Sequence, residues 1–95
     1  MITSQSTFDV DAVRGDFPIF GKPLPNGKQL VYLDSASSAQ KPLAVIRKEA
    51  EVYENYYANA YRGVYDFGAR VDDELEATRD TVREMIGAES TREIV

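Results

Sequence analysis

The stretch Val31–Pro42 (VYLDSASSAQKP) separates a short apolar segment before it from a long helical pattern after it. A short apolar run, Leu30 to Leu33, ends at Asp34, and small polar residues then lead to Lys41-Pro42, where a long helical pattern begins. This order predicts a short strand, a tight polar loop and the start of a helix. Small side chains let a ligand approach the backbone closely and leave amides accessible as donors. The stretch therefore predicts either a binding loop or a simple turn.

The composition limits the classes of function. The 95 residues, 43% of them hydrophobic, suffice for one small domain. The net charge of -5 argues against a nucleic-acid partner, because such binding depends on clustered cations. The absence of Cys and His excludes disulfides, thiolate chemistry and the usual transition-metal ligands within the chain. No segment has the length of a membrane span or the pattern of a secretion signal, so we expect a cytoplasmic protein without a membrane partner.

An arm and loop, residues 1–29, precede the central stretch. The residue pattern of the arm predicts a helix of about two turns, capped by Asp9 and ended by Gly15 and Pro18. An apolar patch follows and is expected to dock the arm on a core: Phe17, Ile19 and Phe20. The segment Lys22–Lys28 contains two prolines and an Asn-Gly pair, which are typical of a loop or hairpin turn.

Two long amphipathic helices are predicted after the central stretch. Apolar residues recur at spacings of three and four from Pro42 to about Ala58, and again from Phe67 to Met85. Gly87 is placed to end the second helix through a left-handed C-cap. The first helix ends in a cluster more typical of a core edge or subunit contact than of catalysis: Tyr53, Tyr56 and Tyr57. The second predicts ion pairs on a solvated face: Glu76 with Arg79 and Asp80 with Arg83.

Between these helices, the segment Asn59–Asp66 (NAYRGVYD) interrupts the helical pattern. Arg62 lies beside Gly63 and is flanked by Tyr61 and Tyr65. A guanidinium in such a loop holds a carboxylate or phosphate through paired donors, which predicts an anion-binding loop. A surface arginine in an ordinary turn is the alternative explanation of the same residues.

The last residues predict a local turn and a new element. Ser90–Glu93 has the pattern of a capping box, and Glu93–Val95 resembles the opening of a strand. Because a completed domain seldom finishes on the first apolar residues of a strand, we expect the chain to be the front part of something larger. The sequence contains no glycine-rich phosphate loop, serine-centred nucleophile motif or metal signature.

Three segments together resemble the N-terminal part of the class V aminotransferase family: VYLDSASSAQKP, YENYYANAYRGVYDFGA and EATRDTVREMIGAESTREIV. The chain is most similar to group II cysteine desulfurases of the sulfur-mobilisation type, from about Phe8 onward. The most specific part is Leu33–Ala36 followed by Gln40–Pro42, at a matching distance from Arg62-Gly63. The resemblance implies an α/β fold, the N-terminal segment of a fold type I transferase dependent on pyridoxal phosphate. That segment would contain a helical arm, a short strand, two long helices and the start of a further strand, with residues 30–95 as an incomplete domain.

The resemblance also implies an activity for the parent enzyme. Such homodimers convert L-cysteine into L-alanine and an enzyme persulfide, and supply sulfur to an acceptor protein for iron-sulfur cluster assembly. The loop after the first strand would place Ala36 and Ser37 by the substrate, and the Arg-Gly loop would carry Tyr61 and Arg62 toward the active site of the partner subunit. The family's Schiff-base lysine and persulfide cysteine have no match here, so we assign no catalytic, cofactor-binding or metal-binding residue. We expect no activity and no bound pyridoxal phosphate for this chain alone.

The chain departs from the family pattern around its Arg-Gly pair. The family has His where this chain has Tyr61 and Tyr65, and it usually has Ala where this chain has Ser37. With a reference pKa near ~10, tyrosine carries protons at neutral pH less readily than histidine, whose reference pKa is near ~6.5. Two alternatives therefore stand beside the desulfurase: a free-standing helical interaction module, and a fragment of another class V enzyme such as a selenocysteine lyase.

Overall fold

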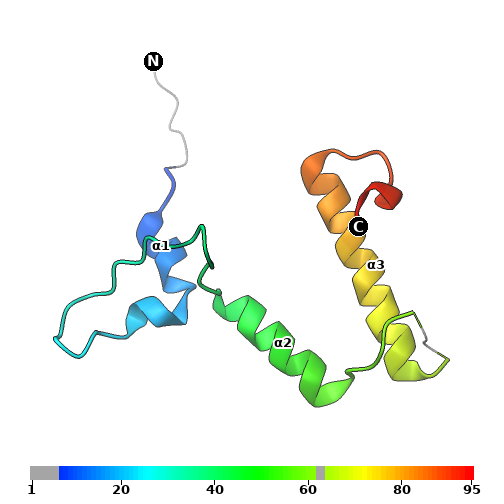
Figure 1. Cartoon of the computed structure of the whole chain (residues 1–95), viewed down its shortest axis with the longest axis horizontal. Helices are drawn as coiled ribbons and strands as arrows, with labels where there is room; N and C mark the ends of the chain where they lie inside the picture. Colours follow the sequence, from blue (N-terminus) through cyan, green and yellow to red (C-terminus); the bar gives the residue numbers. More distant parts are fainter. Residues whose placement is uncertain (1–6, 62–63) are drawn as a thin grey trace. The chain divides into compact units, whose positions relative to one another are not determined.

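The chain forms two compact units, Met1–Glu49 and Ala50–Val95, in a computed structural model that describes residues 7–61 and 64–95 (Figure 1). The described elements follow one another as α1 (Val10–Gly15), the 3-10 helix η1 (Pro18–Gly21), α2 (Leu43–Asn55), α3 (Asp66–Ile86) and the 3-10 helix η2 (Thr91–Glu93). None of the helices in these residues is long and apolar enough to cross a membrane.

The two predicted strands are absent from the described residues, which corrects the α/β expectation for this segment taken alone. Residues 29–34 are irregular, and Val31 and Leu33 are 75% and 90% exposed. Of the segment Glu93–Val95, which is predicted to open a further strand, Glu93 is the last residue of η2 and Ile94 has an extended backbone. A strand is stabilised by hydrogen bonds to a neighbouring strand, and the described residues offer neither segment such a neighbour.

The helix predicted in the arm is confirmed, whereas the apolar patch after it, expected to dock on a core, is not buried: Phe17 and Phe20 are half-buried and Ile19 is 37% exposed. The Asp9 side chain caps α1 by accepting from the amide of Ala12 at 3.1 Å. The guanidinium of Arg14 lies 4.3 Å from the centre of the Phe20 ring, and the Phe17 and Phe20 rings are 5.9 Å apart. These aromatic contacts fold the short arm onto itself.

Backbone hydrogen bonds close the loops of the first unit. The Asn-Gly turn forms as predicted, because the Leu24 amide donates to the Lys28 carbonyl at 2.9 Å and Gly27 has a φ of 79°. The Leu43 amide donates to the Asp16 carbonyl at 2.8 Å, which ties the arm to the first residue of α2.

The three tyrosines at the end of α2 differ in burial: Tyr56 is buried, whereas Tyr53 and Tyr57 are exposed. The helix ends at Asn55 and not near Ala58, and the next residue, Tyr56, is only 2% exposed. The guanidinium of Arg70 lies 3.6 Å from the centre of that ring, and the Tyr56 hydroxyl donates to Glu74 Oε2 at 2.7 Å. The end of α2 is therefore joined to α3 by one buried aromatic side chain with a polar contact at its tip.

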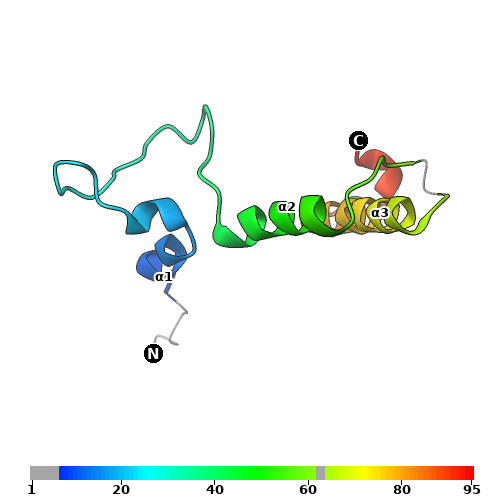
Figure 2. The same ribbon diagram turned by 90° about the horizontal axis from the view of Figure 1, so that it is seen from below.

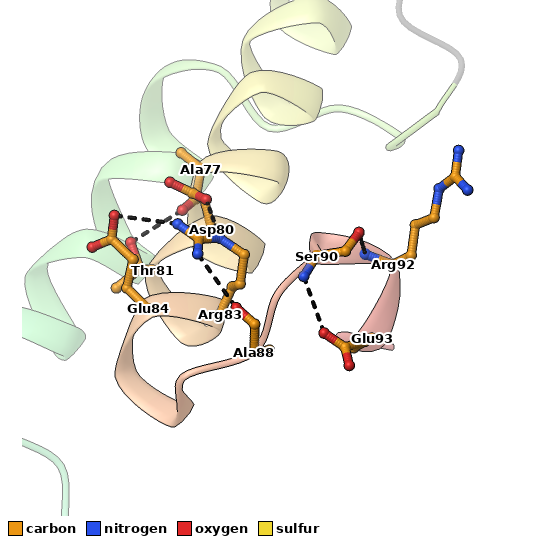
Figure 3. A network of polar contacts seen from close by, with 9 residues as sticks. All are labelled: Ala77, Asp80, Thr81, Arg83, Glu84, Ala88, Ser90, Arg92 and Glu93. Carbon is orange, nitrogen blue, oxygen red and sulfur yellow. Dashed lines mark hydrogen bonds and ion pairs between the residues drawn. The ribbon is translucent and has the colours of Figure 1, made fainter.

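The predicted end of α3 is confirmed in detail. Gly87 adopts a φ of 71°, and its amide donates to the carbonyls of Arg83 and Glu84. Ser90 and Glu93 form the predicted capping box, drawn in Figure 3. Both Figure 1 and Figure 2 show the chain turning back after Gly87, so that η2 lies beside the last turns of α3.

Ion pairs line the exposed face of α3 at the predicted spacing. Arg79 Nε lies 3.5 Å from Glu76 Oε1, and Arg83 Nε lies 2.8 Å from Asp80 Oδ1. The pKa of Arg83 is raised above its ordinary value, first by the hydrogen bond to Asp80 and then by the charges of Asp80 and Glu84. Arg83 Nη1 also reaches the carbonyl of Ala88, so the same side chain holds the turn that follows the helix (Figure 3).

The left-handed cap at Gly87 generates a stability prediction. Gly87→Ala should destabilise the end of α3 by roughly 1 kcal/mol, since a Cβ disfavours positive φ. Gly15→Ala is the matched control, because a Cβ at either glycine meets nothing within 4 Å and only Gly87 has a positive φ. Chemical unfolding followed by circular dichroism measures both. Equal effects of the two substitutions would contradict the role of the cap.

Candidate functional site

The loop predicted to contact substrate is a hydrogen-bonded turn over residues 35–37. The Asp34 carbonyl accepts from the amides of Ser37 and Ser38, at 3.0 and 3.1 Å. Ala36 lies at the tip of the turn, and both Ala36 and Ser37 are exposed. The expectation of accessible amide donors is therefore wrong for Ser37 and Ser38, because the turn itself uses them.

Two side chains brace this turn from its flanks. The Tyr32 hydroxyl donates to the Ser38 carbonyl, and Lys41 Nζ donates to the Ala39 carbonyl at 2.6 Å. Hydrogen bonds from neighbouring side chains thus hold the loop between the irregular Leu30–Leu33 segment and α2. It presents the small side chains of Ala36 and Ser37 outward.

A cavity of about 360 Å³ lies next to the end of this loop. Its lining combines apolar residues of η1 and α2 with the polar end of the loop: Pro18, Ile19, Lys22, Gln40, Lys41 and Ile46. Ala36 and Ser37 do not line it, so it is distinct from the predicted substrate contact.

Tyr61, the second predicted contact, is held against α3. Its amide donates to Asp72 Oδ1, and its hydroxyl donates to Glu76 Oε1 at 3.3 Å while accepting from Arg79 Nη2 at 2.8 Å. The predicted substrate residue Arg62 lies outside the described residues. Ala36 and Ser37 belong to the first unit and Tyr61 to the second.

Sequence reasoning missed the three α3 residues that hold Tyr61. Asp72, Glu76 and Arg79 are spaced by four and three, which places them on one helical face. That face was interpreted as solvated and without function. The available signal was this spacing together with a tyrosine in the preceding loop, but many solvated helix faces share it.

The described residues of this chain do not make a cradle for pyridoxal phosphate. Lys41 Nζ is engaged by its own loop, and Lys48 also has a partner. Lys22 and Lys28 lie in the loop of the arm, and no other lysine is present. We therefore derive no chemical step through that cofactor from this chain's residues.

Comparison with known proteins places the chain in a family of enzymes. Residues 31–95 match the model of the aminotransferase class-V family, and the chain belongs to that family. It is similar to a cysteine desulfurase of Yersinia pseudotuberculosis serotype O:1b (strain IP 31758), with 45% identity over 89 residues, 94% of this chain and 22% of that protein. A cysteine desulfurase of Yersinia pestis (strain Pestoides F) is 46% identical over 88 residues, 93% of this chain and 21% of that protein. The resemblance drawn from the sequence is confirmed, and the chain spans about a fifth of these relatives' length.

The brace on the substrate turn is testable by amide hydrogen exchange. Tyr32→Phe should speed exchange of the Ser37 and Ser38 amides about fivefold, since one hydroxyl hydrogen bond is worth about 1 kcal/mol. Tyr53→Phe removes a hydroxyl from α2 and should leave both rates unchanged. If neither substitution alters these rates, Tyr32 does not brace the turn.

Proposed function

We propose that this chain is the N-terminal, substrate-side segment of a cysteine desulfurase dependent on pyridoxal phosphate. The longer enzyme would convert L-cysteine into L-alanine and leave the sulfur as an enzyme persulfide. The observation that carries the proposal is the 45% identity to a cysteine desulfurase across 94% of this chain. The chain by itself would be inactive, because it contains neither Cys nor a lysine that matches the family's Schiff-base position.

Within that homodimer, we propose that Ala36 and Ser37 contact the substrate of their own subunit and that Tyr61 and Arg62 lie toward the substrate of the partner subunit. The turn at Ala36 and Ser37 supports this, because it is exposed, preformed and free of bulky side chains. A guanidinium at position 62 has the paired donors that a substrate carboxylate needs. Ala36, Ser37 and Arg62 would contact and orient the amino acid.

The remaining parts of the proposal come from the family. Pyridoxal phosphate, when bound to the longer enzyme, supplies the electron sink that such carbon-sulfur cleavage requires. The rest of the enzyme, a second subunit and a sulfur-acceptor protein are the proposed partners. A cytoplasmic role in iron-sulfur cluster assembly completes the proposal.

The exposed apolar residues of α2 bear on the alternative of an interaction module. Val45 is 48% exposed, Ile46 is 45% exposed and Tyr53 is 63% exposed. An autonomous module would offer this surface to a foreign partner, whereas the desulfurase proposal assigns it to the rest of the same enzyme. The long relatives favour the second assignment.

Assay of the longer protein tests the proposal directly. Purified with pyridoxal phosphate, it should release equal amounts of alanine and sulfide from L-cysteine in the presence of a reductant. A preference for selenocysteine by several orders of magnitude would identify a selenocysteine lyase instead. Absence of turnover on both amino acids, with the cofactor bound, would overturn the proposal.

Arg62 offers a substitution test within the same enzyme. Arg62→Ala should lower kcat/KM for L-cysteine by 10-fold or more while the cofactor stays bound, since one charge-assisted contact is worth about 1.5 to 3 kcal/mol. Arg92→Ala is the control, because the Arg92 side chain points away from the network around it (Figure 3). Unchanged kinetics for Arg62→Ala would remove this residue from the site.

A further inference from the structure

Tyr61 is the one residue other than glycine with a positive φ, 62°, among residues 7–61 and 64–95. A side chain with a Cβ disfavours this left-handed conformation, which persists only where surrounding contacts enforce it. Contacts with the rest of the structure must therefore hold Tyr61 in this conformation.

Three residues of α3 supply those contacts. Asp72 fixes the backbone of Tyr61 through its amide, while Glu76 and Arg79 fix the phenol hydroxyl from its two sides. The hydroxyl donates to the carboxylate and accepts from the guanidinium, so both of its hydrogen-bonding capacities are used. Backbone and side chain are thus held by one helical face, which is sufficient to maintain an unfavourable φ.

Arg79 is itself fixed by more than this contact. Its Nη1 donates to the carbonyl of Ile94, and its Nε lies 3.5 Å from Glu76 Oε1. The side chain is 29% exposed. Because a guanidinium is planar and carries donors on three nitrogens in a fixed arrangement, one Arg joins the Tyr61 turn, α3 and the C-terminal segment, whereas a lysine has a single nitrogen.

We propose that Arg79, together with Asp72 and Glu76, is a positioning residue that locks Tyr61, itself a proposed substrate-site residue, in its left-handed conformation. The part that concerns turnover rests on the proposed function. In this account the Tyr61 hydroxyl is committed to α3. Tyr61 serves the substrate site by anchoring the loop and not by carrying a proton.

Hydrogen exchange of the Tyr61 amide in the 95-residue chain tests the lock itself. Tyr61→Phe and Arg79→Gln should each speed exchange about fivefold, and Asp72→Ala should remove the protection. Asp72→Asn keeps an oxygen acceptor and should retain most of it. Tyr57→Phe is the matched control, because Tyr57 and Tyr61 are 62% and 60% exposed and only the second hydroxyl is held by α3.

Kinetics of the longer enzyme test the consequence for the site. Arg79→Gln and Tyr61→Phe should lower kcat/KM for L-cysteine about fivefold, Arg79→Lys should recover only part of it, and Tyr57→Phe should have no effect. The pH profile of kcat/KM should keep its shape in Tyr61→Phe. A lost limb of that profile would show that Tyr61 transfers a proton and would overturn the positioning role.

The two experiments separate failure of the lock from failure of the proposed function. An unprotected Tyr61 amide in the wild-type chain, or protection that survives Asp72→Ala, overturns the lock whatever the enzyme does. Protection that responds as expected, in a longer protein that does not act on L-cysteine, supports the lock and overturns the desulfurase assignment.

Discussion

The contact of Tyr56 with Arg70 and Glu74 is the constraint on which the second unit depends. Tyr56 is the one large side chain that is fully buried among the described residues, and the accompanying buried hydrophobic residue is Ala58, at 7% exposure. Arg70 covers the ring face and Glu74 accepts the hydroxyl, so a hydrophobic body and its polar tip are both satisfied. Hydrogen bonds, a cap and ion pairs add local contacts along α3.

Polar contacts of α3 extend the same constraint to the neighbouring loop. Asp72, Glu76 and Arg79 hold Tyr61, and Arg79 also reaches the carbonyl of Ile94. In the first unit, hydrogen bonds to the Asp34 carbonyl close a turn that exposes Ala36 and Ser37. In both units the candidate substrate contacts lie on short segments fixed by nearby donors and acceptors.

The sequence predicted the structural features that depend on residues close together in the chain. The Asp9 cap, the Gly87 cap, the Ser90 capping box and the ion pairs of α3 all formed as expected, because each depends on residues within one or two turns. The strands at Leu30–Leu33 and at the C-terminus could not be judged this way, since strand pairing depends on distant segments. The hold on Tyr61 was also missed, because it joins residues 11 to 18 positions apart.

The central claim is that the turn at Ala36 and Ser37 forms part of a substrate site in a longer class V enzyme. A crystal structure of that enzyme with pyridoxal phosphate and an unreactive L-cysteine analogue tests it most directly. We expect the analogue to lie in van der Waals contact with the turn, which keeps its hydrogen bonds to the Asp34 carbonyl. An analogue bound elsewhere, with the turn facing solvent, would contradict it.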